Sequence, residues 1–235
     1  MWLIVIIIAI IAFYTSYTKV QNQIGGGLDI NSLVYSQREH SPHIKNRVIK
    51  TFSLPLPLDT FPRPDTNDSQ KVLKELTYLA QLTRDPNPDK LKLANRIEKE
   101  GVLKYFLWFA GSKGLVYDEG HLTQVAKDTE TLAYLMKSNY NRPRPYQLGF
   151  LLGKHVNPIR NARTSSYPCE HTLCAKVLAY QLSYNNPKYK DLLHAIAKKI
   201  ELSRYYGGMN FPSDTIAALR LADILRNKIK YLETV

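Results

Sequence analysis

Three short polar clusters in the second half of the sequence carry residue types that could bind and react with an anion. The first cluster holds Lys137 and Arg144, the second holds His171, and the third holds Arg204 and Asp214. Lysine and arginine side chains can neutralise the charge that develops on a transferring phosphoryl group, and a histidine can give or take a proton near neutral pH. We therefore expect the three clusters to form one site for a tetrahedral oxyanion.

The second cluster is predicted to lie at the start of a helix that begins with Pro168. Proline suits the first helical position because its missing N–H would have no partner there. The free amides of Cys169, Glu170 and His171 then point out of the positive end of the helix, where they can bind phosphate oxygens. We also expect the thiol pKa of Cys169 to fall at this terminus beside cations, which makes this residue a candidate nucleophile.

The two cysteines of the chain, Cys169 and Cys174, lie five residues apart in the same predicted helix. They fall on different faces of that helix, where a disulfide is geometrically poor. A metal site built from these two thiols and His171 is not expected, because the three positions do not share one helix face and no fourth ligand is evident. The sequence therefore predicts no metal and no other cofactor.

The elements that must position the clusters are helices, because apolar residues recur at helical spacing and no stretch alternates convincingly as a strand. We expect an all-α bundle of roughly six helices joined by short loops, preceded by an N-terminal apolar helix. The helical segments are expected at 68–85, 91–97, 102–109, 122–136, 170–183, 187–204 and 213–232. Among their inward-facing residues we place Leu192 and Ile216.

The first residues form an apolar run, Trp2 to Tyr14, which ends before the first charge at Lys19. A membrane anchor, a cleaved secretory signal and a buried core helix are the alternatives. The run lacks the basic residues before it and the small-residue cleavage site after it that a signal needs, and it is short for a span of about 17–25 apolar residues. We favour an uncleaved anchor over residues 1–18 with a single span; cleavage would give a secreted or periplasmic protein.

Residues 19–66 show little periodicity and contain a glycine run and several prolines, which predicts an extended segment. This segment either packs along the body or forms a plain linker, and the composition favours the linker. Residues 67–235 form the predicted helical domain.

The charge of the chain points to anionic partners. Lys plus Arg number 32 against 20 Asp plus Glu, a formal net charge of +12. Such a balance suits phosphate esters, acidic lipid surfaces or nucleic acid. Nucleic acid is not expected, because no compact basic arm or known binding motif gathers the positive residues.

Taken together, the three clusters resemble the motifs of the type 2 phosphatidic acid phosphatase family, which includes class A acid phosphatases and vanadium haloperoxidases. The resemblance covers residues 68–235 and is strongest over 137–214. The first family motif is matched by Lys137 and Arg144-Pro145, the second by Pro168 and His171, and the third by Ser203, Arg204 and Asp214. The residues around His171 look like the acid phosphatase branch. The chain departs from the family at Cys169, Glu170 and Asn210.

The resemblance implies a phosphate pocket in which Lys137, Arg144 and Arg204 bind the phosphate. Cys169 and Glu170 hold the phosphate-binding positions at the start of the helix that carries His171. It also implies that His171 protonates the leaving group. In the family, a third-motif histidine attacks phosphorus and an aspartate orients it. Here Asn210 holds the place of that histidine, and an amide nitrogen has no available lone pair. Asp214, one helical turn away, would orient this amide instead, and a vanadate cofactor is not expected.

Two main hypotheses follow. The first is a membrane-tethered acid-phosphatase-like enzyme that hydrolyses phosphate monoesters with an altered nucleophile, for which Cys169 and the loop residue His155 are candidates. The second is a catalytically impaired relative that binds phosphate-bearing ligands or lipid head groups, which Asn210 favours. A structural membrane component that only retains the fold is a third alternative.

Overall fold

The computed structural model describes residues 30–34, 47–53, 55–56, 58 and 60–231 of the chain. The chain divides into two compact units, Met1–Val34 and Tyr35–Val235. In the first unit the described residues include one short helix, η1 (Ile30–Ser32). The predicted anchor, residues 1–18, lies outside the described residues, and no helix within them is long and apolar enough to span a bilayer.

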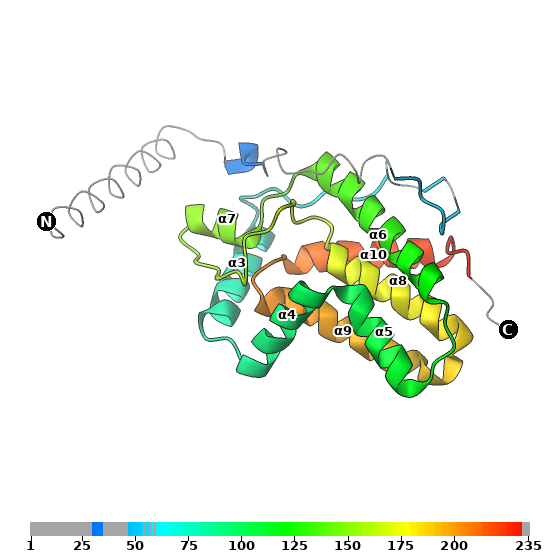
Figure 1. Ribbon diagram of the computed structural model, residues 1–235. Helices are drawn as coiled ribbons and strands as arrows, with labels where there is room; N and C mark the ends of the chain where they lie inside the picture. The colour runs from blue at the N-terminus through cyan, green and yellow to red at the C-terminus, as the bar shows by residue number, and fades with distance from the viewer. Residues whose placement is uncertain (1–29, 35–46, 54, 57, 59, 232–235) are drawn as a thin grey trace, which may run out of the picture. The chain divides into compact units, whose positions relative to one another are not determined.

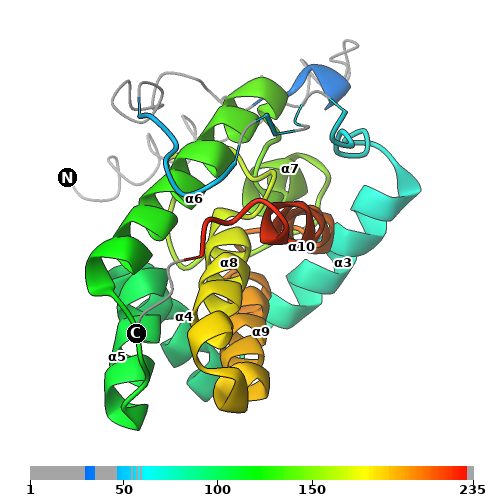
Figure 2. The same ribbon diagram turned by 90° about the vertical axis from the view of Figure 1, so that its right-hand side faces the viewer.

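The second unit is built from helices (Figures 1 and 2), which confirms the all-α prediction. No strand occurs in the described part of the chain, where the extended pairing is an isolated bridge between Phe52 and Ile229. The short α7 was not expected from the sequence. The elements in order are α3 (Gln70–Arg84), α4 (Pro88–Glu100), α5 (Val102–Lys113), α6 (Glu119–Tyr140), α7 (Pro145–Leu151), α8 (Glu170–Asn185), η3 (Pro187–Tyr189), α9 (Lys190–Tyr206) and α10 (Pro212–Arg226).

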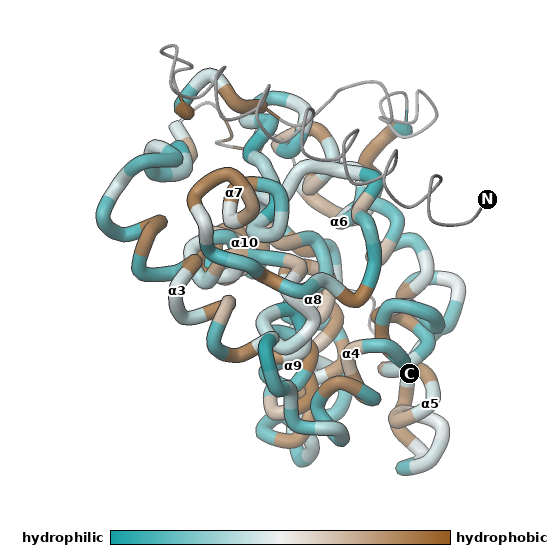
Figure 3. Tube along the Cα trace, turned by 90° about the vertical axis from the view of Figure 1, so that its left-hand side faces the viewer, coloured by the Kyte–Doolittle hydropathy of each residue, from teal (hydrophilic) through white to brown (hydrophobic). Residues whose placement is uncertain are grey.

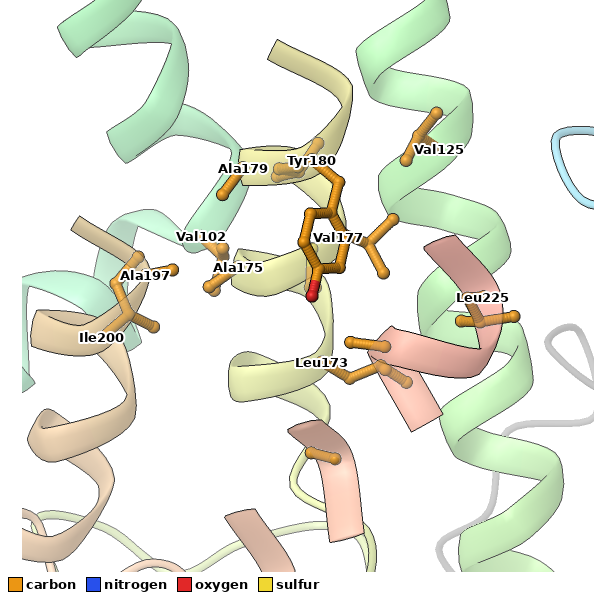
Figure 4. Packing of buried hydrophobic residues seen from close by; sticks show 14 of the residues in the cluster. Val102, Val125, Leu173, Ala175, Val177, Ala179, Tyr180, Ala197, Ile200 and Leu225 are labelled. Carbon is orange, nitrogen blue, oxygen red and sulfur yellow. The ribbon is translucent and has the colours of Figure 1, made fainter. Parts of the chain in front are cut away.

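Helix α8 is the centre of the helical body and packs against α5, α6, α9 and α10. It is apolar on nearly all sides, which is the pattern of a buried helix. Figure 4 shows Leu173 and Val177 of α8 near Leu225 of α10, and Ile200 of α9 on the other side of α8. The first turn of α8, which carries the second polar cluster, is therefore fixed to the middle of the core.

Several surrounding helices are amphipathic, with hydrophilic and hydrophobic residues alternating along each turn of the trace (Figure 3). Two residues expected to face inward do not: Leu192 and Ile216 are 51% and 47% exposed. Each falls outside the buried stripe of its helix, although the adjacent positions Leu193 and Ala217 are buried. The expected apolar face was thus drawn too wide.

Helix α10 ends at Arg226, earlier than the predicted end at residue 232. The chain beyond it pairs with the extended segment, because Ser53 N donates to Lys228 O at 2.7 Å and Lys230 N donates to Thr51 O at 2.9 Å. Backbone groups that make these bonds cannot continue the helical ladder. A long-range pairing therefore sets the end of the last helix.

Within the second unit, the described residues of the extended segment between positions 47 and 66 pack along the helical body, the less favoured of the two alternatives that the sequence left open. Phe52 is 1% exposed and Phe61 is 5% exposed, and both belong to the hydrophobic core. The carboxylate of Asp128 on α6 accepts hydrogen bonds from Lys50 N at 2.7 Å and from both Thr51 N and Thr51 Oγ1. Asp128 thus fixes the segment against α6.

We expect Phe52→Ala to lower the free energy of unfolding by about 3–5 kcal/mol, because it empties a fully buried aromatic site. The matched control is Val48→Ala, since Val48 lies in the same segment but is 73% exposed; its effect should stay within about 0.5 kcal/mol. Urea denaturation of both variants measures the difference. Equal, small effects of the two substitutions would show that the segment is not part of the folded body.

Candidate functional site

A hollow of about 160 Å³, here called the cationic pocket, lies where the three polar clusters meet. Six of the eight site residues predicted from the sequence line it: Lys137, Arg144, Glu170, His171, Arg204 and Asn210. The remaining wall comes from Glu130, Tyr134, Arg160, Arg163, Thr164 and Met209. The predicted residues Cys169 and Asp214 do not line the hollow and are fully buried in the protein.

Lys137 lies in the last turn of α6 and is 1% exposed. Its Nζ donates to Ser165 O at 2.6 Å and to Thr164 Oγ1 at 3.3 Å. Burial, together with the nearby charge of Arg144, lowers the pKa of Lys137 to about 7. A bound anion would stabilise the protonated ammonium and raise this pKa.

Arg144 precedes α7 and connects the first cluster to the segments that carry the other two. Its Nε donates to Thr164 O at 2.8 Å, and its Nη1 donates to Met209 O at 2.8 Å and to Asn210 Oδ1 at 3.3 Å. Burial and the nearby Arg204 lower the pKa of Arg144. These bonds fix the guanidinium plane at the base of the pocket.

Arg204 at the end of α9 pairs with Glu98 of α4, a residue that the sequence analysis did not identify. Arg204 Nη1 donates to Glu98 Oε2 at 2.8 Å, and Arg160 also binds Glu98. Burial raises the pKa of Glu98, but Arg204, His171 and Arg160 outweigh burial and bring this pKa to about 2. Arg204 is 1% exposed, and its Nε has no hydrogen-bond partner among the described residues. A buried guanidinium with an unused donor suits an anion.

His171 lies in the first turn of α8 with its side chain 20% exposed. Its Nε2 is 3.8 Å from Glu98 Oε2, too far for a hydrogen bond. Burial and the positive charge of Arg204 lower the pKa of His171 well below its ordinary value, although Glu98 opposes them. The imidazole is therefore neutral at pH 7 in the empty pocket, and a bound dianion would raise its pKa.

The start of α8 differs from the prediction. The helix begins at Glu170 with Cys169 as the N-cap residue, and Pro168 precedes the cap after a cis peptide bond. The amide of Cys169 is not free for a ligand, because it donates to Asp214 O at 3.0 Å. The helix therefore starts at Glu170, as the expected segment 170–183 has it, but Pro168 is not its first residue.

The expected fall in the pKa of the Cys169 thiol is wrong. Cys169 is 0% exposed, and its Sγ accepts a hydrogen bond from Thr172 Oγ1 at 3.2 Å. Burial raises the pKa of the Cys169 thiol, against the smaller opposing effect of Arg204. The sequence suggested a lowered pKa from the helix terminus and the cations, but desolvation of the thiolate outweighs both. Cys174 is also a free and buried thiol.

Asn210 and Asp214 meet as their spacing predicted. The Asn210 amide donates to Asp214 Oδ2 at 3.3 Å and to Ser166 O at 2.8 Å, and its Oδ1 accepts from Arg144. Asp214 Oδ2 also accepts from Phe211 N at 2.8 Å, at the start of α10. The Asn210 side chain is thus held on both its nitrogen and its oxygen.

A second ion-pair network beneath the pocket was not predicted. Arg142 Nη1 donates to Asp214 Oδ1 at 2.6 Å and to Ser213 Oγ at 2.8 Å. Glu75 of α3 lies 3.7 Å from Arg142 and accepts from both the amide and the hydroxyl of Ser213. Arg142, two residues before Arg144, therefore neutralises Asp214. The sequence showed that Arg142 lies in the first cluster, but it did not show that Asp214 is its partner.

A loop of residues 152–169 forms one wall of the pocket and carries Arg160 and Arg163. The turn after α9 holds this loop, since Ile159 N donates to Gly207 O at 2.9 Å. Gly208 has a φ of 61°, and a Cβ there would lie 2.5 Å from Asn157 O. Glycine is therefore required at position 208 for the loop to approach this closely.

Two further candidates lie outside the cationic pocket. His155 is exposed, its ring is 6.4 Å from that of Phe150, and it does not line the pocket. In the described residues, no group of three or more His, Cys, Asp or Glu side chains could hold a metal ion. Glu130 and Tyr134 do line the pocket and lie on the Lys137 face of α6, a relation that helical spacing could have revealed.

No protein-family model matches this chain, and no curated protein matches it in sequence. Among solved structures, the fold is similar to the first transmembrane PAP2 type phosphatidylglycerolphosphate phosphatase from Bacillus subtilis. The TM-score is 0.50 and the sequence identity is 20%, over 68% of this chain and 85% of that chain. At this identity the likeness shows a shared fold. The chain therefore has the helical fold of PAP2-type phosphatases, as the motif resemblance predicted.

We expect Glu98→Gln to lower the free energy of unfolding at pH 7 by about 3 kcal/mol. The pKa of Glu98 is 4.5 ordinarily and about 2 in the folded protein. Its stabilising effect is therefore complete above pH 4.5 and is lost as pH falls toward 2. Denaturant unfolding of the wild type and the variant at pH 7 and near pH 3 should show a difference that shrinks on acidification.

The matched control for this test is Glu100→Gln on the same helix. Glu100 makes a 3.4 Å ion pair with Arg96, with both side chains about a third or more exposed, and such surface pairs contribute less than about 1 kcal/mol. A loss in Glu98→Gln no larger than in this control would contradict the assigned ion pair with Arg204.

Proposed function

We propose that the chain binds phosphate monoesters in the cationic pocket, with the phosphate held by Lys137, Arg144 and Arg204. The observation that carries this proposal is the gathering of three buried cationic side chains around one hollow, with Arg204 Nε left without a partner. Buried positive charges are costly unless counter-charges complete the site, and the lining holds fewer carboxylates (Glu130 and Glu170) than lysine and arginine side chains. A dianionic phosphate supplies further negative charge and can accept a hydrogen bond from Arg204.

Binding without covalent catalysis fits this pocket better than the histidine route of the resembled family. Asn210 occupies the nucleophile position, and its amide nitrogen is held by Ser166 O and Asp214. The Cys169 thiol is buried with a raised pKa, and His155 does not line the pocket. None of the candidate replacements can therefore attack a phosphorus atom bound there. The proposed protein is a phosphate-ester binder on a phosphatase fold.

Hydrolysis by water is the second candidate function, and the position of His171 favours it. The imidazole lines the pocket, and a bound dianion would raise its lowered pKa toward the range in which it can donate a proton. In this alternative, His171 protonates the leaving oxygen, as the family resemblance implies. The absence of a covalent nucleophile would make such turnover slow.

We further propose that residues 1–18 anchor this pocket to a membrane. The support is the apolar run of the sequence, Trp2 to Tyr14, which precedes the first charge. The anchor would hold the pocket close to the bilayer surface, where phosphate-bearing head groups are concentrated. Partition of the full chain and of residues 20–235 between vesicles and buffer tests this part of the proposal.

We expect the affinity for sulfate to fall about tenfold per pH unit above pH 7. Sulfate stays a dianion over this range and guanidinium groups stay protonated, whereas the pKa of Lys137 is about 7 in the empty pocket. Below pH 7 the Lys137 ammonium is already present. Above pH 7, Lys137 must take up a proton when sulfate binds. Isothermal titration calorimetry from pH 6 to 9, in buffers of different ionisation enthalpy, measures both the affinity and the proton uptake.

The control is Lys137→Met, which should bind sulfate more weakly at pH 6 but with little change in affinity from pH 6 to 9. Absence of sulfate binding by the folded wild type would overturn the proposed function. If the affinity of the wild type for sulfate changes as little with pH as that of Lys137→Met, Lys137 does not contact the anion.

A further inference from the structure

A second hollow, here called the apolar pocket, adjoins the cationic pocket. It has a volume of about 260 Å³ and lies between the start of α5, the middle of α6 and the first turns of α8. Glu130, Glu170 and His171 line both hollows. The two hollows therefore share a border at the imidazole, which is where a ligand that occupied both would cross.

The walls of the apolar pocket are mainly hydrocarbon. Val102 and Leu103 come from the start of α5, Ala126 from α6, and Cys174 from α8. The chain reaches α5 through Gly101, whose φ of 85° permits the sharp change of direction between α4 and α5. This turn brings the first residues of α5 to one side of the hollow, opposite the polar border.

We propose that the apolar pocket binds the organic group of the phosphate monoester whose phosphate occupies the cationic pocket. This inference rests on the proposed function, because the phosphate is what places the organic group at the shared border. The ligand class that fits is a monoester of a small, uncharged, apolar alcohol, either an aromatic ring or a short alkyl chain.

The size of the hollow sets the size of that group. A cavity of about 150 Å³ is known to admit benzene. The apolar pocket, at about 260 Å³, has room for one ring with a short substituent or for a short alkyl chain. A sugar or a nucleoside of similar size would place hydroxyl and amide groups against walls that offer few hydrogen-bond partners.

The charges at the border select against a second anionic group. Glu170 lines both hollows and has no ion-pair partner in the described part of the chain, whereas Glu130 is paired with Arg47. Lys127 also lines the apolar pocket, but it is exposed, so solvent and salt screen its positive charge. A carboxylate or second phosphate on the organic group would pass the unpaired Glu170 carboxylate and be repelled. An uncharged organic group meets no such cost.

The test uses alkyl phosphonates, which keep the anionic head but cannot be hydrolysed at the phosphorus–carbon bond. Calorimetric titration with methyl-, propyl-, butyl- and phenylphosphonate should show affinity rising about fourfold per added methylene, until the pocket is filled. Carboxypropylphosphonate, with a charged chain end, should bind more weakly than butylphosphonate. Each titration uses the folded full chain.

The variant Ala126→Phe fills the apolar pocket from α6. It should abolish the gain from chain length while leaving the affinity for methylphosphonate unchanged. The matched control is Ala195→Phe, the same substitution at an exposed position on α9, which should keep the full gain. A folded Ala126→Phe protein is recognised by its unchanged binding of methylphosphonate.

The outcomes separate the two proposals. If methylphosphonate does not bind to the wild type, both the proposed function and this inference are overturned. If methylphosphonate binds but affinity does not change with chain length, the cationic pocket stands and the apolar pocket is not the site of the organic group. A gain in affinity that survives Ala126→Phe would likewise overturn the inference, since the chain would then bind elsewhere.

Discussion

The carboxylate of Asp214 is the interaction on which the candidate site depends. It accepts hydrogen bonds from Arg142 of the first cluster at 2.6 Å and from Asn210 of the third at 3.3 Å. The backbone of the same residue accepts from Cys169, the cap of α8. One fully buried residue thus joins all three clusters. Because breaking a buried ion pair leaves an uncompensated charge, this junction holds the base of the pocket rigid before any ligand arrives.

Above this neutral base, the pocket keeps an excess of positive charge. Glu98 neutralises only part of it, through Arg204 and Arg160, while burial holds the pKa of Lys137 near 7. Burial and neighbouring positive charges therefore disfavour the charged forms of Lys137 and Arg144. Proteins often keep a less stable arrangement of side chains at a site where their function requires it. The proposed binding of phosphate esters rests on two features of this pocket, the buried cationic side chains and Asn210 at the nucleophile position.

The helical period of the sequence was sufficient to predict the all-α fold. The resemblance of the three clusters to the motifs of a known family predicted that Lys137, Arg144, His171, Arg204 and Asn210 would meet in one pocket. The sequence could not reveal Glu98 as the partner of Arg204, since the two positions are far apart in the chain and meet only through packing of α4 on α9. The pKa of the Cys169 thiol was predicted in the wrong direction for a related reason. Its burial depends on the whole fold, whereas the helix terminus and nearby cations are visible locally.

The most direct test of the account is phosphorus-31 NMR of phenyl phosphate mixed with the wild type and with Asn210→His. For the wild type we predict a saturable shift of the ester signal with little release of inorganic phosphate, because the pocket binds the ester and lacks the attacking imidazole. Asn210→His should release phosphate, since its imidazole would lie beside Asp214. An unshifted ester signal, or wild-type release as fast as that of the variant, would contradict the account.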